Sequence, residues 1–287
     1  SAVIGVIGCA ALSVPLPWVL FLTLYVIVKI AYSTSLVFYD SMLSDVTTPE
    51  RMDDVSSQGY AWGYIGSCIP FILSVVLINF TPLSISVSMP IAFTLNAIWW
   101  LGMTIPLTRK YKQLHSVPRQ KHMVRDGFSR LFSVFREKFP GKKGIMLFLV
   151  AFFLYIDGVY TIIDMATSFG DALGFDTTDL LLALLLTQVI AFPSAILFGF
   201  LAAKIPNDKL ILVCIFAYTG VALFAIQMNQ VWEFWVLAVC VGLFQGGIQA
   251  LSRSFFAKIV PAEKSGEFFG IMDIFGKSAA FFGTLCS

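Results

Sequence analysis

The chain has 287 residues, of which 58% are hydrophobic and only 13% are charged, and its mean hydropathy is +0.85. Ordinary soluble domains are about 45–50% apolar and about 25% charged. A soluble fold of this size cannot bury so much apolar surface, so lipid must be the solvent for much of it. This composition excludes a secreted disulfide-rich protein, a disordered tail and a cytosolic enzyme. The formal net charge of +2 is uninformative as a total, but the placement of the charges is informative.

Apolar runs of about 20 residues, enough to cross a bilayer as a helix, recur along the chain. A partial span is predicted at 1–13, and a last partial span begins near residue 267. Full spans are predicted at 17–38, 58–80, 89–107, 144–168, 178–203, 210–228 and 232–252. The predicted fold class is therefore an all-α integral membrane protein with seven full and two partial transmembrane helices. Because the chain lacks an initiator methionine and begins and ends in apolar runs, we expect it to be part of a longer protein.

Basic residues mark alternate connections between these spans. Lysine and arginine occur in the connections at 39–57, 108–143, 204–209 and 253–266. Neither occurs in the connections at 14–16, 81–88, 169–177 and 229–231. Positive charge accumulates in cytoplasmic loops, and a wrong span count would scramble this alternation. The pattern therefore supports both the count and the sidedness, and we expect a multi-pass integral membrane protein.

The basic interval 108–143 separates an N-terminal half at 1–107 from a C-terminal half at 144–287. Within it, residues 124–139 have the apolar spacing of an amphipathic helix, with basic residues between the apolar positions. Such a helix rests on the inner leaflet and attracts anionic lipid. A linker that tethers the two halves and a regulatory partner site are the two interpretations left open.

The two halves contain similar blocks. Residues 39–51 and residues 252–264 each leave a span, cross a short turn that contains a proline, and enter a span that contains glycine. A repeat in the same orientation is typical of parallel halves related by an axis along the membrane normal. This predicts the major facilitator fold, with two pseudo-symmetric six-helix bundles.

Short blocks distributed along most of the chain are more specific. They are Val37-Phe-Tyr39, Asp45, Pro49-Glu-Arg51, Trp62-Gly-Tyr-Ile-Gly66, Gly246-Gly-Ile-Gln-Ala-Leu-Ser-Arg-Ser254, Glu267-Phe-Phe-Gly270, Asp273 and Gly276-Lys277. With these blocks the chain resembles the vacuole effluxer branch of the major facilitator superfamily, which includes autophagy-linked vacuolar amino-acid effluxers of fungi and their bacterial relatives. The resemblance implies a twelve-span fold, in which the first span here is the third helix and the last is the eleventh.

One departure concerns the Gly-x-Leu-Ala-Asp-Arg turn that many facilitators carry between paired helices. The copy in the second half reads Gly199-Phe-Leu-Ala-Ala-Lys204, so that Ala203 replaces the acid. This replacement argues against a charge-relay gate at the turn itself.

Ionisable residues inside a span are costly and usually face a cavity or a partner. The family template places the spans at 17–38, 144–168 and 232–252 around the cavity. The candidates for substrate binding or coupling on these spans are Lys29, Tyr32, Asp157, Tyr160, Thr161, Gln245 and Gln249. Asp157 lies on a polar stripe, where a carboxyl group is suited to carry a proton. The alternatives are that Lys29 extends to an interface, that Asp157 pairs with Lys29, and that the two amides bond a neighbouring helix.

A second set of residues is predicted to act in gating or to stabilise the fold. Its members are Asp45, Arg51, Trp62, Arg253, Asp273 and Lys277. Asp273 and Lys277 are four residues apart on one helix, so they partly cancel each other's charge. The five cysteines stand singly in apolar stretches, and His115 and His122 have no neighbouring cysteine. We therefore expect packing cysteines and neither a metal nor a cofactor.

The leading functional hypothesis is a secondary active transporter of small solutes that works by alternating access. A solute or ion gradient would supply the energy, because no Gly-x-x-x-x-Gly-Lys-Ser/Thr motif is present. The resemblance implies amino-acid efflux, with a proton as the candidate coupling ion. One alternative is an ion-coupled sugar transporter, in which Trp62, Tyr32 and Tyr160 stack on a sugar ring. Another is a non-transporting membrane receptor or scaffold, whereas the sequence predicts neither an enzyme nor a nucleic-acid-binding protein.

Overall fold

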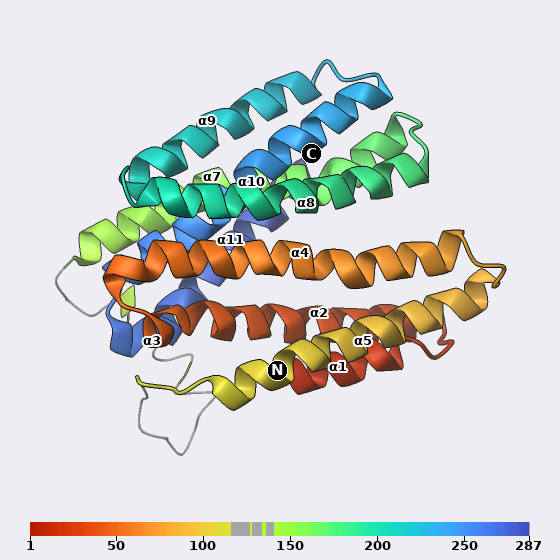
Figure 1. Ribbon diagram of the computed structural model, residues 1–287, viewed down its shortest axis with the longest axis horizontal. Helices are drawn as coiled ribbons and strands as arrows, with labels where there is room; N and C mark the ends of the chain where they lie inside the picture. The colour runs from red at the N-terminus through yellow and green to blue at the C-terminus, as the bar shows by residue number, and fades with distance from the viewer. Residues whose placement is uncertain (116–126, 128–133, 136–140, 287) are drawn as a thin grey trace. The chain divides into compact units, whose positions relative to one another are not determined.

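The computed structural model describes residues 1–115, 127, 134–135 and 141–286, and within these ranges it contains helices and no strand. Its elements are α1 (Ala2–Ala11), α2 (Trp18–Ser41), α3 (Leu43–Val46), η1 (Pro49–Arg51), α4 (Met52–Asn79), α5 (Ile85–Lys110), α7 (Lys142–Ala172), α8 (Thr177–Ala202), α9 (Asn207–Ala225), α10 (Val231–Ile259), η2 (Ala262–Lys264) and α11 (Ser265–Cys286) (Figure 1). The predicted all-α fold is confirmed.

Within the described ranges, eight helical segments are long and apolar enough to cross a membrane, and α1 is a shorter apolar helix. They follow the predicted spans in order, so the chain is a multi-pass integral membrane protein. One refinement concerns α11, which the sequence predicts as a partial span. It has 22 residues and is among the eight.

Two predicted boundaries were wrong, because charged residues were assigned to loops. Helix α4 begins at Met52 rather than near residue 58, and α10 continues to Ile259 rather than ending near 252. The added turns carry Asp53 and Lys258, which form an ion pair with each other. A charge that finds a partner inside the protein does not need to leave the helix for water, so the helices extend through these positions.

The predicted amphipathic helix at 124–139 lies outside the described residues, apart from residues 127, 134 and 135. The predicted contact with anionic lipid therefore stays a prediction. His122 lies outside the described residues as well.

Close contacts divide the chain into two compact units, and α4 contributes to both. Unit 1 comprises residues 1–40 and 66–113, and unit 2 comprises residues 41–65 and 114–287. The predicted division into halves on either side of 108–143 stays a prediction.

In unit 1, α1 packs closely on α5 and α2. A β-carbon built at Gly5 would overlap the Trp100 ring, and one built at Gly8 would meet Val28. The absence of side chains at these two positions lets the helix backbones approach each other. Helix α2 also contacts α5 through an edge-to-face pair of Tyr32 and Trp100, whose ring centroids are 5.8 Å apart.

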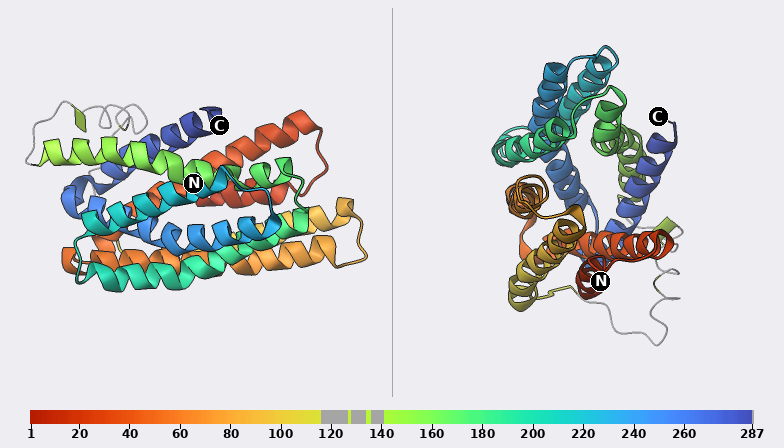
Figure 2. Two further views of the ribbon diagram at one scale, coloured as in Figure 1. Left: turned by 90° about the horizontal axis from the view of Figure 1, so that it is seen from above. Right: turned by 90° about the vertical axis from the view of Figure 1, so that its right-hand side faces the viewer.

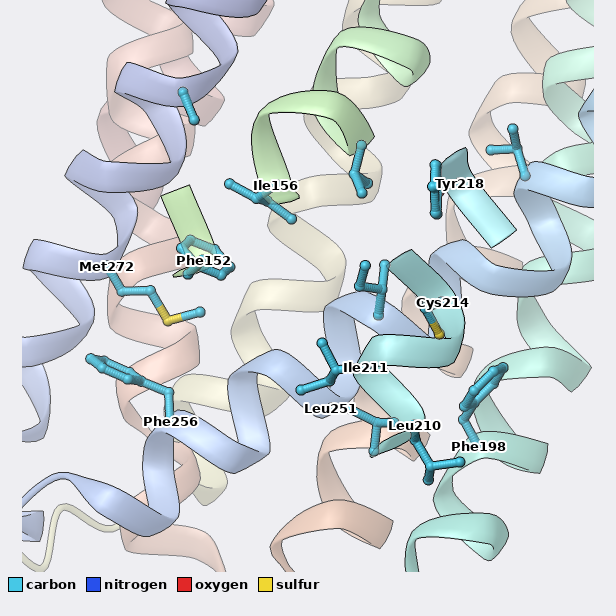
Figure 3. Packing of buried hydrophobic residues seen from close by; sticks show 14 of the residues in the cluster. Phe152, Ile156, Phe198, Leu210, Ile211, Cys214, Tyr218, Leu251, Phe256 and Met272 are labelled. Atoms are coloured by element: carbon cyan, nitrogen blue, oxygen red, sulfur yellow. The ribbon is translucent and has the colours of Figure 1, made fainter. Parts of the chain in front are cut away.

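In unit 2, α10 packs along α8 and α9, and α7 packs along α11 (Figures 1 and 2). Glycines in α10 permit the closest of these approaches. A β-carbon at Gly242 would lie 2.8 Å from the Thr187 carbonyl oxygen, and one at Gly246 would lie 2.8 Å from that of Ala191. The apolar core draws side chains from all five helices: Phe152, Ile156, Phe198, Leu210, Ile211, Cys214, Tyr218, Leu251, Phe256 and Met272 (Figure 3).

Helix α8 begins at a side-chain cap outside the membrane-spanning segments. The Asp176 carboxylate accepts a hydrogen bond of 2.8 Å from the backbone N–H of Thr178. This hydrogen bond, together with one to the Thr178 side chain, holds the pKa of Asp176 below its ordinary value. The cap satisfies one of the N–H groups that every helix start leaves without a partner.

Candidate functional site: a polar ladder between α4 and α10

A row of polar side chains on the first part of α4 faces a second row on α10, and both rows lie in unit 2. Residues four apart share one face of a helix, so each row forms a stripe. We refer to the two stripes together as the polar ladder: Ser56, Tyr60 and Tyr64 on α4, and Gln245, Gln249 and Arg253 on α10.

At one end of the ladder, α4 holds the guanidinium group of Arg253, which is only 4% exposed. Arg253 Nε donates a 2.9 Å hydrogen bond to Ser56 Oγ, and Nη2 donates one of 2.9 Å to the Ser56 carbonyl oxygen. The guanidinium carbon also lies 4.6 Å from the centroid of the Tyr60 ring. Directed hydrogen bonds and the negative face of an aromatic ring both stabilise a buried cation, so α4 stabilises Arg253 in its buried position.

At the other end, Tyr64 connects the two amides of α10. The Tyr64 hydroxyl donates a 2.6 Å hydrogen bond to Gln249 Oε1, and the Gln245 side chain hydrogen-bonds the same hydroxyl. A phenol has one proton, which here goes to Gln249, so Gln245 must donate through its amide N–H. This leaves Gln245 Oε1 as an acceptor, and that atom is buried without a hydrogen-bond partner.

Other polar groups without partners lie beside this end of the ladder. Tyr218 on α9 is close enough to Tyr64 to interact electrostatically, and its hydroxyl is buried and unpartnered. Gln188 Oε1 on α8 is also unpartnered. Gln188 lies one turn before Ala191, which packs in the same cluster as Tyr64. Buried polar atoms are almost always satisfied in proteins, so a group of exceptions at one place requires an explanation.

A charged cluster ties together the ends of α4, α9 and α10 on the side predicted to be cytoplasmic. Asp53 is 8% exposed and forms an ion pair with Lys258. Asn207 Nδ2 donates a 2.6 Å hydrogen bond to Asp53 Oδ1. We refer to Asp53, Asn207 and Lys258 as the ionic latch.

The ionic latch and the α4 side of the ladder were not predicted from the sequence. Neither Asp53 nor Asn207 was a candidate, and Lys258 was assigned to a loop. A signal was present, because Asp53, Ser56, Tyr60 and Tyr64 follow helical spacing. The latch also lies beside the turn that lacks its acid, since a β-carbon at Gly199 would be 2.8 Å from Ser57 Cβ. A carboxylate is therefore present near this turn, but it belongs to Asp53 on α4 and not to the turn itself.

On α7, the predicted polar stripe faces α11. Asp157 Oδ1 and Thr161 Oγ1 are both buried without a hydrogen-bond partner, and both lie against Gly283. Tyr160 lies beside Gly276, where a β-carbon would be 3.4 Å from the tyrosine ring. The same helix reaches α10 through the Tyr155 hydroxyl, which is 2.7 Å from Ser252 Oγ.

Two of the predicted residues belong to unit 1. Lys29 is exposed, and Tyr32 is 44% exposed, with its ring against Trp100. Because Asp157 belongs to unit 2, the predicted pairing of Lys29 with Asp157 stays a prediction.

Among the predicted gating residues, Asp45 contacts His115. Asp45 Oδ1 accepts a 3.1 Å hydrogen bond from the backbone N–H of His115 and lies 2.7 Å from its ring Nδ1. His115 was not predicted from the sequence as the partner of Asp45. The loop that follows α5 is therefore tied to the end of α3.

The remaining gating candidates make more exposed contacts. Arg51 Nη2 lies 3.9 Å from Asp54 Oδ2, and because both side chains are exposed this pair contributes little stability. Trp62 is 66% exposed and packs edge-on against Phe192. Lys277 Nζ and Asp273 Oδ1 are 3.2 Å apart, as their four-residue spacing predicts.

Comparison with known proteins identifies the family. The family described as "Vacuole effluxer Atg22 like" matches residues 1–287. The chain belongs to the vacuole effluxer family. The relatives of this chain come from both bacteria and fungi.

Three relatives illustrate the range of similarity. An "Uncharacterized MFS-type transporter YxiO" of Bacillus subtilis is 42% identical over 273 residues, which is 93% of this chain and 64% of that protein. "Autophagy-related protein 22" of Coccidioides immitis is 27% identical over 84% of this chain and 47% of its own length. The protein of the same name from Saccharomyces cerevisiae is 28% identical over 82% and 52%. The chain thus spans about half to two thirds of the length of these relatives.

Proposed function

We propose that the protein is a secondary active transporter that moves small polar solutes by alternating access, and that it exports amino acids across a bacterial cell membrane. Membership of the vacuole effluxer family and the relative named as an MFS-type transporter support the class of function. The observation that carries the proposal is the orphaned carbonyl oxygen of Gln245 beside the Tyr64 hydroxyl, deep in a membrane-spanning helix.

Lipid as a solvent makes an unpartnered amide costly inside a spanning helix. Lipid offers no hydrogen bonds, so a buried amide inside a spanning helix is stabilised only by protein, water or a polar ligand. In the ladder, Tyr64 hydrogen-bonds Gln249 Oε1 and the side-chain N–H of Gln245, whereas Gln245 Oε1 has no hydrogen-bond partner. An N–H donor satisfies such an acceptor, and the ammonium group of an amino acid is a donor of this kind.

We further propose that Asp157 couples solute movement to an ion gradient and that a proton is the coupling ion. An ionisable residue inside a span is costly, and such residues commonly mark proton pathways in transporters. In this proposal Lys29, Tyr32, Tyr160, Thr161 and Gln249 help to line the solute pathway. The gating candidates Asp45, Arg51, Trp62, Arg253, Asp273 and Lys277 control access to it.

Among the described residues, the contacts of Trp62 and Tyr32 do not favour the sugar-transporter alternative. The Trp62 ring already packs against Phe192, and the Tyr32 ring packs against Trp100. Sugars therefore enter the test as competing solutes. A receptor or scaffold without transport would show no flux of either class.

The test is solute flux in proteoliposomes that contain the full chain, with labelled amino acids and sugars offered separately under an imposed pH gradient. We expect amino-acid flux, and we expect Gln245→Leu to reduce it at least tenfold. Gln58→Leu is the matched control, because Gln58 is an exposed amide on α4. Absence of amino-acid flux in the wild type, or equal flux in both variants, would contradict the proposal.

A further inference from the structure

Two oxygen atoms on α7 converge on one point of the seam with α11. Asp157 and Thr161 lie one helical turn apart. Asp157 Oδ1 and Thr161 Oγ1 are both buried without a hydrogen-bond partner. A β-carbon built at Gly283 would overlap both oxygens and would lie 3.2 Å from Asp157 Cγ. The two side chains therefore occupy the space that a side chain at position 283 would otherwise fill.

The two oxygens, Asp157 Oδ1 and Thr161 Oγ1, are suited to bind a positively charged ligand. A carboxylate oxygen can only accept, and a hydroxyl offers lone pairs as well as one proton. Burying such oxygens without a partner is costly, and unpartnered buried atoms in native proteins commonly mark an ion or water site. A cation between the two oxygens satisfies both at once.

We infer that Asp157 and Thr161 form a binding site for a monovalent cation, with Gly283 as the position that keeps room for it. The cation is either a proton on the carboxyl group, shared with the Thr161 hydroxyl, or a sodium ion that both oxygens coordinate. Cation binding stands independently of transport, whereas its use for coupling rests on the function proposed above.

Other charged or titratable residues lie on the helices packed with α7. They are Glu267, Asp273, Lys277 and Cys286 on α11, Asp208, Lys209, Cys214 and Tyr218 on α9, Glu233, Cys240, Arg253 and Lys258 on α10, and Asp179 on α8. Lys277 is engaged by Asp273, and Arg253 is held by Ser56 and Tyr60. Tyr160 lies on α7 itself, one turn from Asp157. None of the described contacts gives Asp157 Oδ1 a basic partner.

Gly283 offers a steric test with a control on the same helix. Gly283→Ala places a methyl group where the two oxygens lie, so we expect it to abolish cation binding. At Gly276 a β-carbon would make ordinary contacts of 3.4 Å with Phe152 and Tyr160. Gly276→Ala changes helix composition equally but leaves the oxygen pair in place, so we expect it to bind the cation.

The experiment is thermal unfolding of the purified full chain in detergent. One arm replaces choline chloride by sodium chloride at constant ionic strength and pH, and the other lowers the pH in choline chloride without sodium. We expect one arm to raise the Tm of the wild type by ~3 °C in a saturable manner. Response in the first arm identifies sodium, and response in the second identifies the proton.

The variants decide whether the response arises at this site. Asp157→Asn is close in shape and should lose the response, as should Thr161→Val, whereas Thr161→Ser keeps a hydroxyl and should retain it. Asp164→Asn, which changes an exposed acid on α7, should also respond like the wild type.

The inference is overturned if the wild type and Asp157→Asn respond alike in both arms, or if Gly276→Ala loses the response together with Gly283→Ala. Solute flux separates this result from the proposed function. Flux without a cation response would remove the cation site and leave transport intact. A cation response without flux would do the reverse.

Discussion

Helices α2 and α10 are both apolar and long enough to span a membrane, yet very different fractions of their residues are buried. In the most apolar 18-residue stretch of each segment, 61% of the residues of α10 are buried, compared with 6% for the segment that contains α2. Helix α10 is packed by α7, α8 and α9, and its polar side chains find partners on α4. Helix α2 exposes Lys29 and Tyr32.

This difference shows that a polar residue in a spanning helix has two distinct fates. On α10, polar groups are held by other protein groups, so their removal leaves a buried partner unsatisfied, and stability falls. On α2, polar groups have exposed surfaces, so their removal costs little stability, and any effect appears in function. Three predictions test this contrast, beginning with the largest expected effect.

The largest loss of stability should come from the ionic latch. Asp53→Ala leaves Lys258 without its carboxylate and Asn207 without its acceptor, and we expect a loss of about 3 kcal/mol in unfolding free energy. This lies at the low end for a buried pair, because the Lys258 side chain is 29% exposed. Denaturant unfolding in detergent measures the loss.

Asp54→Ala is the matched control for the latch. Asp54 is the next residue, its side chain is 46% exposed, and its ion-pair partner Arg51 is exposed as well. We expect a change of no more than about 0.5 kcal/mol. Equal losses in the two variants would show that the latch does not stabilise unit 2.

The next effect should come from the packing of α10 on α8. Gly246→Ala would place a methyl group 2.8 Å from the Ala191 carbonyl oxygen and 2.9 Å from Ala195 Cβ, so the two helices must separate. We expect a loss of about 1–3 kcal/mol, measured as for the latch. Gly220→Ala on α9 meets nothing within 4 Å and should instead gain up to about 1 kcal/mol from helix propensity.

The smallest effect on stability should come from α2. Lys29→Gln changes an exposed side chain, so we expect its unfolding free energy to stay within about 0.5 kcal/mol of the wild type. Solute flux, measured in the same proteoliposomes, should fall if Lys29 lines the pathway as proposed. A large loss of stability would contradict the contrast between α2 and α10, because it would show that Lys29 has a buried structural role.

Much of the fold could be predicted from composition and charge. Runs of apolar residues identified every candidate span, because crossing lipid requires about 20 of them in succession. The four-residue spacing of Asp273 and Lys277 predicted their ion pair. The one-turn spacing of Gln245 and Gln249 was also visible, whereas Arg253 was assigned to the following connection and lies on α10 in the structure.

The partners of these residues could not be predicted. Ser56 and Tyr64 lie 197 and 185 residues from the α10 side chains that they contact, and nothing in their local sequence marks that pairing. Asp53 looked like part of a polar turn, although it lies inside a helix and is buried. Gly283 lies in an apolar run, and the local sequence does not reveal that Asp157 and Thr161 of α7 lie against it.

The amino-acid sequence by itself thus determined that the protein is a set of membrane-crossing helices with a defined charge asymmetry. Both properties follow from the transfer of individual side chains between water and lipid, which depends on local composition. Only the tertiary structure decided which polar groups are satisfied and which are left open, as at Gln245 and at the pair of Asp157 and Thr161. Hydrogen bonding and steric fit are properties of pairs of surfaces, and those pairs form only when distant helices meet.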